Sequence, residues 1–161
     1  MPQDDLRLSA PPTVKVGMLV RKPPAEVFEA FVDPSITTRF WFTHSTGKLM
    51  PGADVRWDWE MYGISTEVSV KVVEENSRIV FTWAHGAEPT TVEMGFTPWQ
   101  DDTTYVTVTE TGLTGTGDEM ASYAMDTAGG YSFVLAAAKA LLEHGIELTV
   151  VGDHVPKGLE I

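Results

Sequence analysis

Two ionisable side chains are in phase with the apolar side of alternating segments, and both are of types that transfer protons. Glu110 follows Val108 by two residues, and His85 follows Trp83 by two residues. Side chains two residues apart share one face of a strand. In a buried site, a carboxyl group or a neutral imidazole can act as a general acid or base. The alternative is that both lie at strand ends and reach solvent at the rim of a sheet. Glu110 and His85 are therefore the candidate catalytic residues.

Large aromatic side chains are dense on the same predicted sheet face and on the helix expected to cover it. Apolar cavities with a few polar groups are the usual ligand sites of proteins. Aromatic side chains also fill solid cores well, and the sequence leaves both interpretations open. The candidate ligand-binding residues are Trp41, Trp57, Trp59, Phe81, Trp83, Met94, Phe96, Tyr123, Thr127 and Tyr131.

Arg39 stands beside the Phe40-Trp41-Phe42 segment, near the expected mouth of such a cavity. A guanidinium group there could meet the anionic head of a ligand. The alternative is a surface ion pair in an acidic chain.

Other catalytic patterns are missing from the sequence. The histidines at positions 44, 85, 144 and 154 lack metal-ligand spacing, so we expect no metal site. The glycine-rich stretch 112–117 is followed by Asp118 and Glu119, which would repel phosphate, and no nucleophile elbow is found. We expect no cofactor.

The composition restricts the class of protein further. The 161 residues suit one domain, and the absence of cysteine excludes disulfides and fits a reducing compartment. A net charge of −12, with only 11 Lys and Arg, argues against a nucleic-acid partner. The chain shows no signal peptide, and no apolar stretch approaches the roughly 20 residues of a membrane span. These features predict a cytoplasmic protein.

The elements that must position these residues begin with a strand over 14–20, where apolar residues alternate. Pro24 then opens a short helix that ends at Asp33-Pro34, and a second short helix is expected over 35–39. Between 53 and 110, five segments with a period of two predict an antiparallel meander with one apolar face. Their apolar rows include Val55 to Met61, Ile64 to Val72, Ile79 to His85, Val92 to Phe96, and Thr104 to Glu110.

A long helical pattern runs from about Asp118 to His144, with Gly145 as its stop. Gly129-Gly130 inside it is expected to bend or weaken the helix. This helix must cover the apolar sheet face. The prediction is an α+β helix-grip fold, a curved antiparallel sheet wrapped around a long C-terminal helix. It divides into a flexible segment 1–12, a domain over 13–145, and a tail over 146–161 that adds a short strand.

One side of the long helix predicted to face away from the sheet is also apolar. It carries Phe133, Ala136, Ala137 and Ala140. Such a strip indicates cover by the tail or by the partner in a homodimer.

The order of these elements resembles the SRPBCC (START-related, birch-pollen-allergen-like) superfamily. Within it, the chain resembles the AHSA-type family, homologues of the activator of the ninety-kilodalton heat-shock chaperone's ATPase. The residues that carry the resemblance are Pro24 to Phe31, Thr38 to Phe42, Arg78 to Trp83, Thr111 to Leu113, Gly130-Tyr131, Leu135, Leu142-Glu143 and Gly145.

This resemblance implies the helix-grip fold and a cavity between sheet and helix. Relatives bind hydrophobic ligands, cyclise polyketides or have no known activity. Tyr131 stands where the family often has tryptophan, and the tail runs past the usual domain end. The eukaryotic co-chaperones of the family carry a further N-terminal domain for which this chain has no room.

Three functions follow from these observations. The first is binding of a small hydrophobic or amphipathic ligand in the cavity. The second is a cyclase or hydratase that uses Glu110 or His85, so the sequence leaves open whether the protein is an enzyme. The third is a co-chaperone-like protein of the stress response that acts through its surface. The sequence does not identify the ligand.

Overall fold

The computed structural model describes residues 6–84, 88–156 and 158–159. Among these residues, seven strands form one antiparallel sheet in the order β1-β7-β6-β5-β4-β3-β2. The strands are β1 (Val14–Val20), β2 (His44–Ser45), β3 (Asp54–Trp59), β4 (Ile64–Glu74), β5 (Arg78–Ala84), β6 (Pro89–Trp99) and β7 (Thr103–Thr111). The helices are α1 (Pro24–Val32), α2 (Pro34–Thr37), α3 (Gly117–His144), α4 (Val150–Asp153) and the 3₁₀ turns η1 (Glu60–Tyr62) and η2 (Gln100–Asp102).

The predicted meander is confirmed in β3 to β7, which follow one another in space as in sequence. β1 pairs along the free edge of β7, and α1 and α2 connect it to the far edge of the sheet. The predicted alternation holds in the central strands, where Phe81, Met94 and Val106 are buried and their sequence neighbours point outward. The two-residue strand β2, paired with β3, was not predicted because it is too short to show a period.

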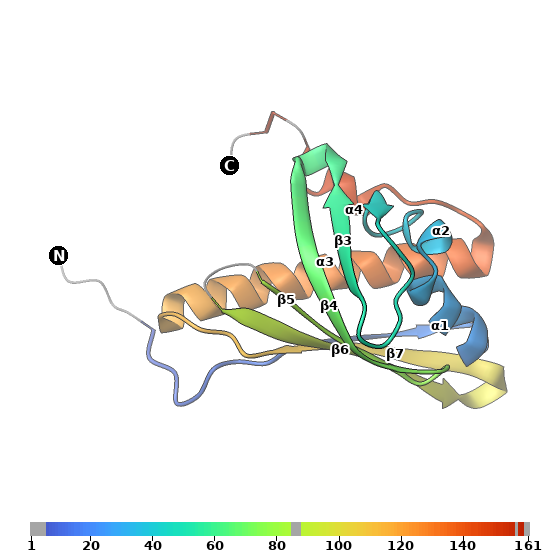
Figure 1. Ribbon diagram of the computed structural model, residues 1–161, viewed down its shortest axis with the longest axis horizontal. Helices are drawn as coiled ribbons and strands as arrows, with labels where there is room; N and C mark the ends of the chain where they lie inside the picture. Colours follow the sequence, from blue (N-terminus) through green and yellow to red (C-terminus); the bar gives the residue numbers. More distant parts are fainter. Residues whose placement is uncertain (1–5, 85–87, 157, 160–161) are drawn as a thin grey trace.

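The long helix α3 crosses one face of the curved sheet (Figure 1). A capping box starts it, in which the Thr116 hydroxyl accepts from the Glu119 amide and the Glu119 side chain accepts from the Thr116 amide. Gly145 ends it in the left-handed conformation, with φ of 65°. α3 is continuous through Gly129 and Gly130, because packing on the sheet offsets their low helix propensity.

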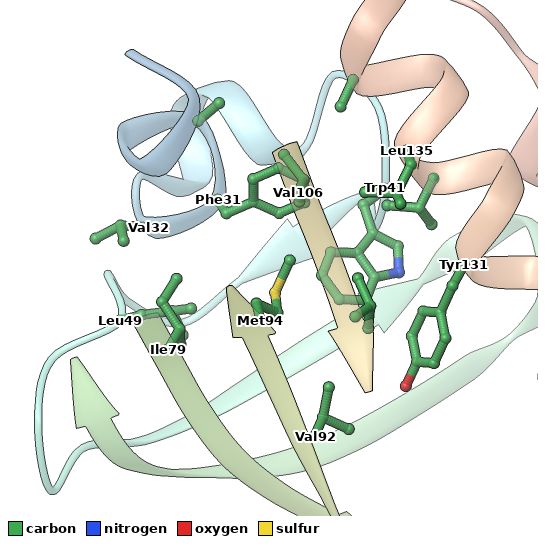
Figure 2. Close-up of a cluster of buried hydrophobic side chains, with 14 of the residues drawn as sticks. Phe31, Val32, Trp41, Leu49, Ile79, Val92, Met94, Val106, Tyr131 and Leu135 are labelled. Carbon is green, nitrogen blue, oxygen red and sulfur yellow. The ribbon is translucent and has the colours of Figure 1, made fainter. Parts of the chain in front are cut away.

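The core lies between the sheet and the helices α1 and α3. Figure 2 shows Phe31 of α1 and Leu135 of α3 directed toward side chains of the strands, among them Met94 and Val106. These four side chains are at most 1 % exposed. The sheet, α1 and α3 therefore share one apolar core, as the helix-grip prediction requires.

Two predictions about the C-terminal part are wrong. The tail does not add a strand in its described residues, since Val150–Asp153 forms the helix α4, which packs on α3. Ala137 does not face away from the core but is fully buried. α3 packs on β1 and also contacts α4, so its buried stripe is wider than one packed face requires.

Ala140 is half-buried, and Phe133 remains 36 % exposed. The Phe133 ring contacts that of His154 in the tail, with centroids 5.4 Å apart. The tail thus covers part of the strip that the sequence marked as apolar. None of the helices in the described ranges is long and apolar enough to cross a membrane.

The substitution Leu135→Ala tests the contribution of α3 to the core. Leu135 is fully buried, so its truncation should lower the free energy of unfolding by about 2–5 kcal/mol. Met125 on the same helix is 71 % exposed, so Met125→Ala should change it by less than about 0.5 kcal/mol. Urea denaturation measures both, and equal losses would contradict this packing.

Candidate functional site

A cavity of ≈ 450 Å³ lies between α3 and the β3–β4 side of the sheet, and α4 supplies part of its wall. This volume is within the usual range of small-molecule sites. Its lining residues are Trp41, Trp59, Tyr62, Ile64, Trp83, Tyr123, Asp126, Thr127, Gly130, Tyr131, Val134, Val151 and His154. Ile64 is 54 % exposed, so the cavity reaches the molecular surface.

Six of the ten predicted ligand-binding residues line this cavity: Trp41, Trp59, Trp83, Tyr123, Thr127 and Tyr131. The other four, Trp57, Phe81, Met94 and Phe96, are fully buried in the core and are absent from the lining. The apolar sheet face is therefore divided into a solid part and a hollow part.

Aromatic residues outside the meander fill the solid part. The Phe96 ring contacts those of Phe28 and Phe31 on α1, with centroids 5.5 and 5.6 Å apart. The Trp57 indole stacks on Phe42 at 4.4 Å and 14°. The alternation in the strands could not predict which residues belong to the solid part and which to the hollow part. Alternation gives the direction of a side chain but not what packs against it.

The tail supplies the wall that the sequence analysis missed. The Tyr62 hydroxyl donates to the Val151 carbonyl at 2.5 Å, and His154 Nδ1 lies 3.0 Å from the same oxygen. These contacts hold α4 beside η1 at the cavity. No periodic signal could have revealed the Tyr62–Val151 contact, since the two residues are 89 positions apart in the sequence.

Three lining rings have nearly equal centroid spacings. The Trp41 centroid lies 6.3 Å from that of Trp83 and 6.5 Å from that of Tyr131, and Trp83 and Tyr131 are 6.4 Å apart. The Trp83 and Tyr131 planes are within 9° of parallel, whereas Trp41 is inclined to them by 76° and 79°. Figure 2 shows the Trp41 indole beside the Tyr131 ring. We call these three residues the aromatic box.

Glu110, the predicted acid, is fully buried near the end of β7. The Tyr123 hydroxyl donates to its Oε2 at 2.5 Å, and the Tyr131 hydroxyl donates to its Oε1. Both carboxylate oxygens thus have a donor from α3, which offsets the cost of burying the group. Glu110 does not reach solvent at the rim, and its two partners separate it from the cavity they line.

The two tyrosines keep their protons over the physiological pH range. Burial is the largest cause that raises the pKa of each hydroxyl, and the hydrogen bond and charge of Glu110 raise it further. Each phenol accordingly keeps the proton that it donates to Glu110.

The remaining candidates lie elsewhere. Arg39 pairs with Glu147 of the tail at 3.2 Å, with both side chains about half exposed, so the surface ion pair is the observed arrangement. His85 lies outside the described residues. His44 contacts Asp58 at 3.1 Å, and His144 lies 3.9 Å from Glu143. Across the described ranges, no three His, Cys, Asp or Glu side chains converge as metal ligands would.

Comparison with known proteins supports the resemblance seen in the sequence. The sequence model of the family described as "Activator of Hsp90 ATPase homolog 1-like protein" matches residues 21–143. No match was found among curated proteins.

Three solved structures are similar to this chain over most of its length. The protein SSP2350 from Staphylococcus saprophyticus is 28% identical with a TM-score of 0.74, over 84% of this chain and 95% of its own. DynU16, from the dynemicin biosynthetic locus, is 24% identical with a TM-score of 0.73, over 84% of this chain and 48% of its own. The Aha1 dimer from Colwellia psychrerythraea is 16% identical with a TM-score of 0.70, over 83% and 97%.

The hydrogen bond between Tyr131 and Glu110 predicts a specific alkaline response. Above pH 10, the unfolded chain loses the Tyr131 proton whereas the folded chain retains it, so the free energy of unfolding falls as pH rises. Tyr131→Phe removes this proton from both states. The fall should then be shallower by up to about 1.4 kcal/mol per pH unit. Denaturant unfolding between pH 8 and 11 measures the slope, and an unchanged slope would contradict the assignment.

Proposed function

The chain belongs to the family of activator of Hsp90 ATPase homolog 1-like proteins, and we propose that it binds a small hydrophobic or amphipathic ligand in the cavity between its sheet and α3. The observation that carries this proposal is the division of the apolar face. The cavity of ≈ 450 Å³ opens to solvent beside Ile64, and its volume and mostly aromatic lining suit a small molecule.

The lining chemistry supports an amphipathic occupant. Trp59 and the aromatic box provide apolar surface, whereas the Tyr62 hydroxyl and Asp126 supply polar groups. Asp126 is exposed, so polar and apolar surfaces meet where the cavity reaches solvent. Such a combination, mostly apolar with a few polar groups, is typical of small-molecule sites.

Gly130 offers a direct test because it lines the cavity from α3. A Cβ built there has no atom within 4 Å, and the same is true of its neighbour Gly129, which is not in the lining. We expect Gly130→Leu to fill the cavity and weaken binding of a hydrophobic fluorescent probe at least tenfold. A titration that follows the fluorescence of the tryptophans near the site measures the affinity of the probe.

Gly129→Leu is the matched control. Both substitutions replace a helical glycine, so both should preserve or raise the stability of α3. Only the substitution at 130 should lower probe affinity. Saturable binding that survives Gly130→Leu unchanged would place the ligand elsewhere, and no saturable binding by the unmodified protein would exclude this function for the probe class.

A second candidate function is acid–base catalysis within the same cavity, of the cyclase or hydratase kind. The contacts of Glu110 with Tyr123 and Tyr131 favour it, because a proton could pass between the carboxyl group and the cavity through a phenol. Binding tolerates Glu110→Gln, whereas catalysis requires the carboxyl group. If Glu110→Gln loses turnover but still binds the probe, the protein is an enzyme that uses this carboxyl group.

Partners and location are part of the proposal as well. The relative from Colwellia psychrerythraea is a dimer, and the exposed edge of Phe133 beside the tail is the surface through which this chain would pair. A co-chaperone role, which the family description suggests, would also use the surface and not the cavity. The lack of cysteine fits a cytoplasmic location.

A further inference from the structure

A second hollow, a groove of ≈ 320 Å³, lies between the tail and segment 38–43. Segment 38–43 forms one side of this groove, and α4 with the two residues before it forms the other. Met61 and Leu148 also line it, and their side chains are 39 % and 37 % exposed. We call this hollow the tail groove. It offers apolar surface that the proposed ligand site does not include.

The cavity and the tail groove are neighbours, because two residues line both of them. These residues are Trp41, which follows α2, and Val151 of α4. A residue that borders two hollows lies between them. Trp41 and Val151 accordingly form a partition between the cavity and the tail groove.

The two parts of this partition are held differently. The Trp41 indole is 7 % exposed and contacts the rings of Phe42 and Trp57, with centroids 5.7 and 5.0 Å apart. Val151 belongs to a helix of four residues, none of which is buried, and it packs only partly against the core. Its carbonyl oxygen accepts from the Tyr62 hydroxyl, which holds the backbone of α4 beside η1. A change of side chain at position 151 therefore alters the partition while the indole and the backbone contact remain.

We propose that Val151 limits the length of the ligand by closing the cavity toward the tail groove. This inference rests on the proposed ligand-binding function and specifies a limit on the apolar part of its ligand. The cavity alone has ≈ 450 Å³, and the tail groove adds ≈ 320 Å³ once the side chain at position 151 is shortened. An apolar chain that reaches the partition stops there in the unmodified protein.

The test is a series of 1-alkanols of increasing chain length, each titrated in competition with the hydrophobic fluorescent probe. Each methylene group that enters an apolar site should raise the affinity about fourfold. In the unmodified protein we expect this rise to stop at a limiting chain length. In Val151→Ala the rise should continue for about two further methylene groups, roughly a sixteenfold gain for the longest alcohols. Val151→Leu should lower the limiting length.

Val150→Ala is the matched control. Val150 is also a partly buried valine of α4, but it lines neither the cavity nor the tail groove. The substitution removes the same two methyl groups from the same helix, so the limiting length should stay unchanged. An equal shift in Val150→Ala and Val151→Ala would show that loosening of α4 sets the limit, and it would overturn the proposal.

The outcomes separate this inference from the function on which it rests. No binding of the probe or of any alcohol would refute the ligand-binding function itself. Saturable binding with one limiting length in the unmodified protein, Val151→Ala and Val151→Leu would keep that function and refute the role of Val151. Urea denaturation checks that each variant is folded, and Val151→Leu, which creates no space, decides the question if Val151→Ala does not fold.

Discussion

The structure depends on how a straight helix covers a curved sheet. The 28 residues of α3 span about 42 Å, and the sheet curves so that β3 and β4 cross the helix in the view of Figure 1. α3 packs directly along β1 at one edge of the sheet. Toward the other edge the gap widens, and only side chains from additional elements can fill it. Where α1 and the segment 40–42 do so, the core is solid; beyond them it is hollow.

Glu110 joins the two layers across this gap. Its carboxylate belongs to β7, and both of its hydrogen-bond partners belong to α3. An unpartnered carboxylate in this position would destabilise the fold, and an apolar residue would pack well. Two phenolic donors supply hydrogen bonds to both oxygens of this buried group, and the same tyrosines, Tyr123 and Tyr131, line the cavity.

The tail supplies a part of the cavity wall that lies outside the family match. The match to the family ends at residue 143, yet Val151 and His154 form part of the lining. Tyr62 holds this segment by its hydrogen bond to the Val151 carbonyl. Family membership therefore accounts for the sheet and α3, but the shape of the cavity mouth depends on residues outside the shared region.

The amino-acid sequence by itself determined the elements and their inward faces. Period-two apolar residues predicted β3 to β7, Gly145 marked the end of α3, and the phase of Glu110 aligned it with the apolar face without deciding whether it is buried. These features are local, because each follows from the direction of a side chain within one strand or helix.

Only the tertiary structure decided which aromatic residues are core and which line a cavity. Trp57 and Trp83 have the same residue type and the same phase, yet Phe42 stacks on one, and the other borders the open space. The tail likewise became a helix and a wall because Tyr62 and α3 lie beside it. Such outcomes depend on what packs against a residue from distant parts of the chain, and periodicity carries no information about distance between segments.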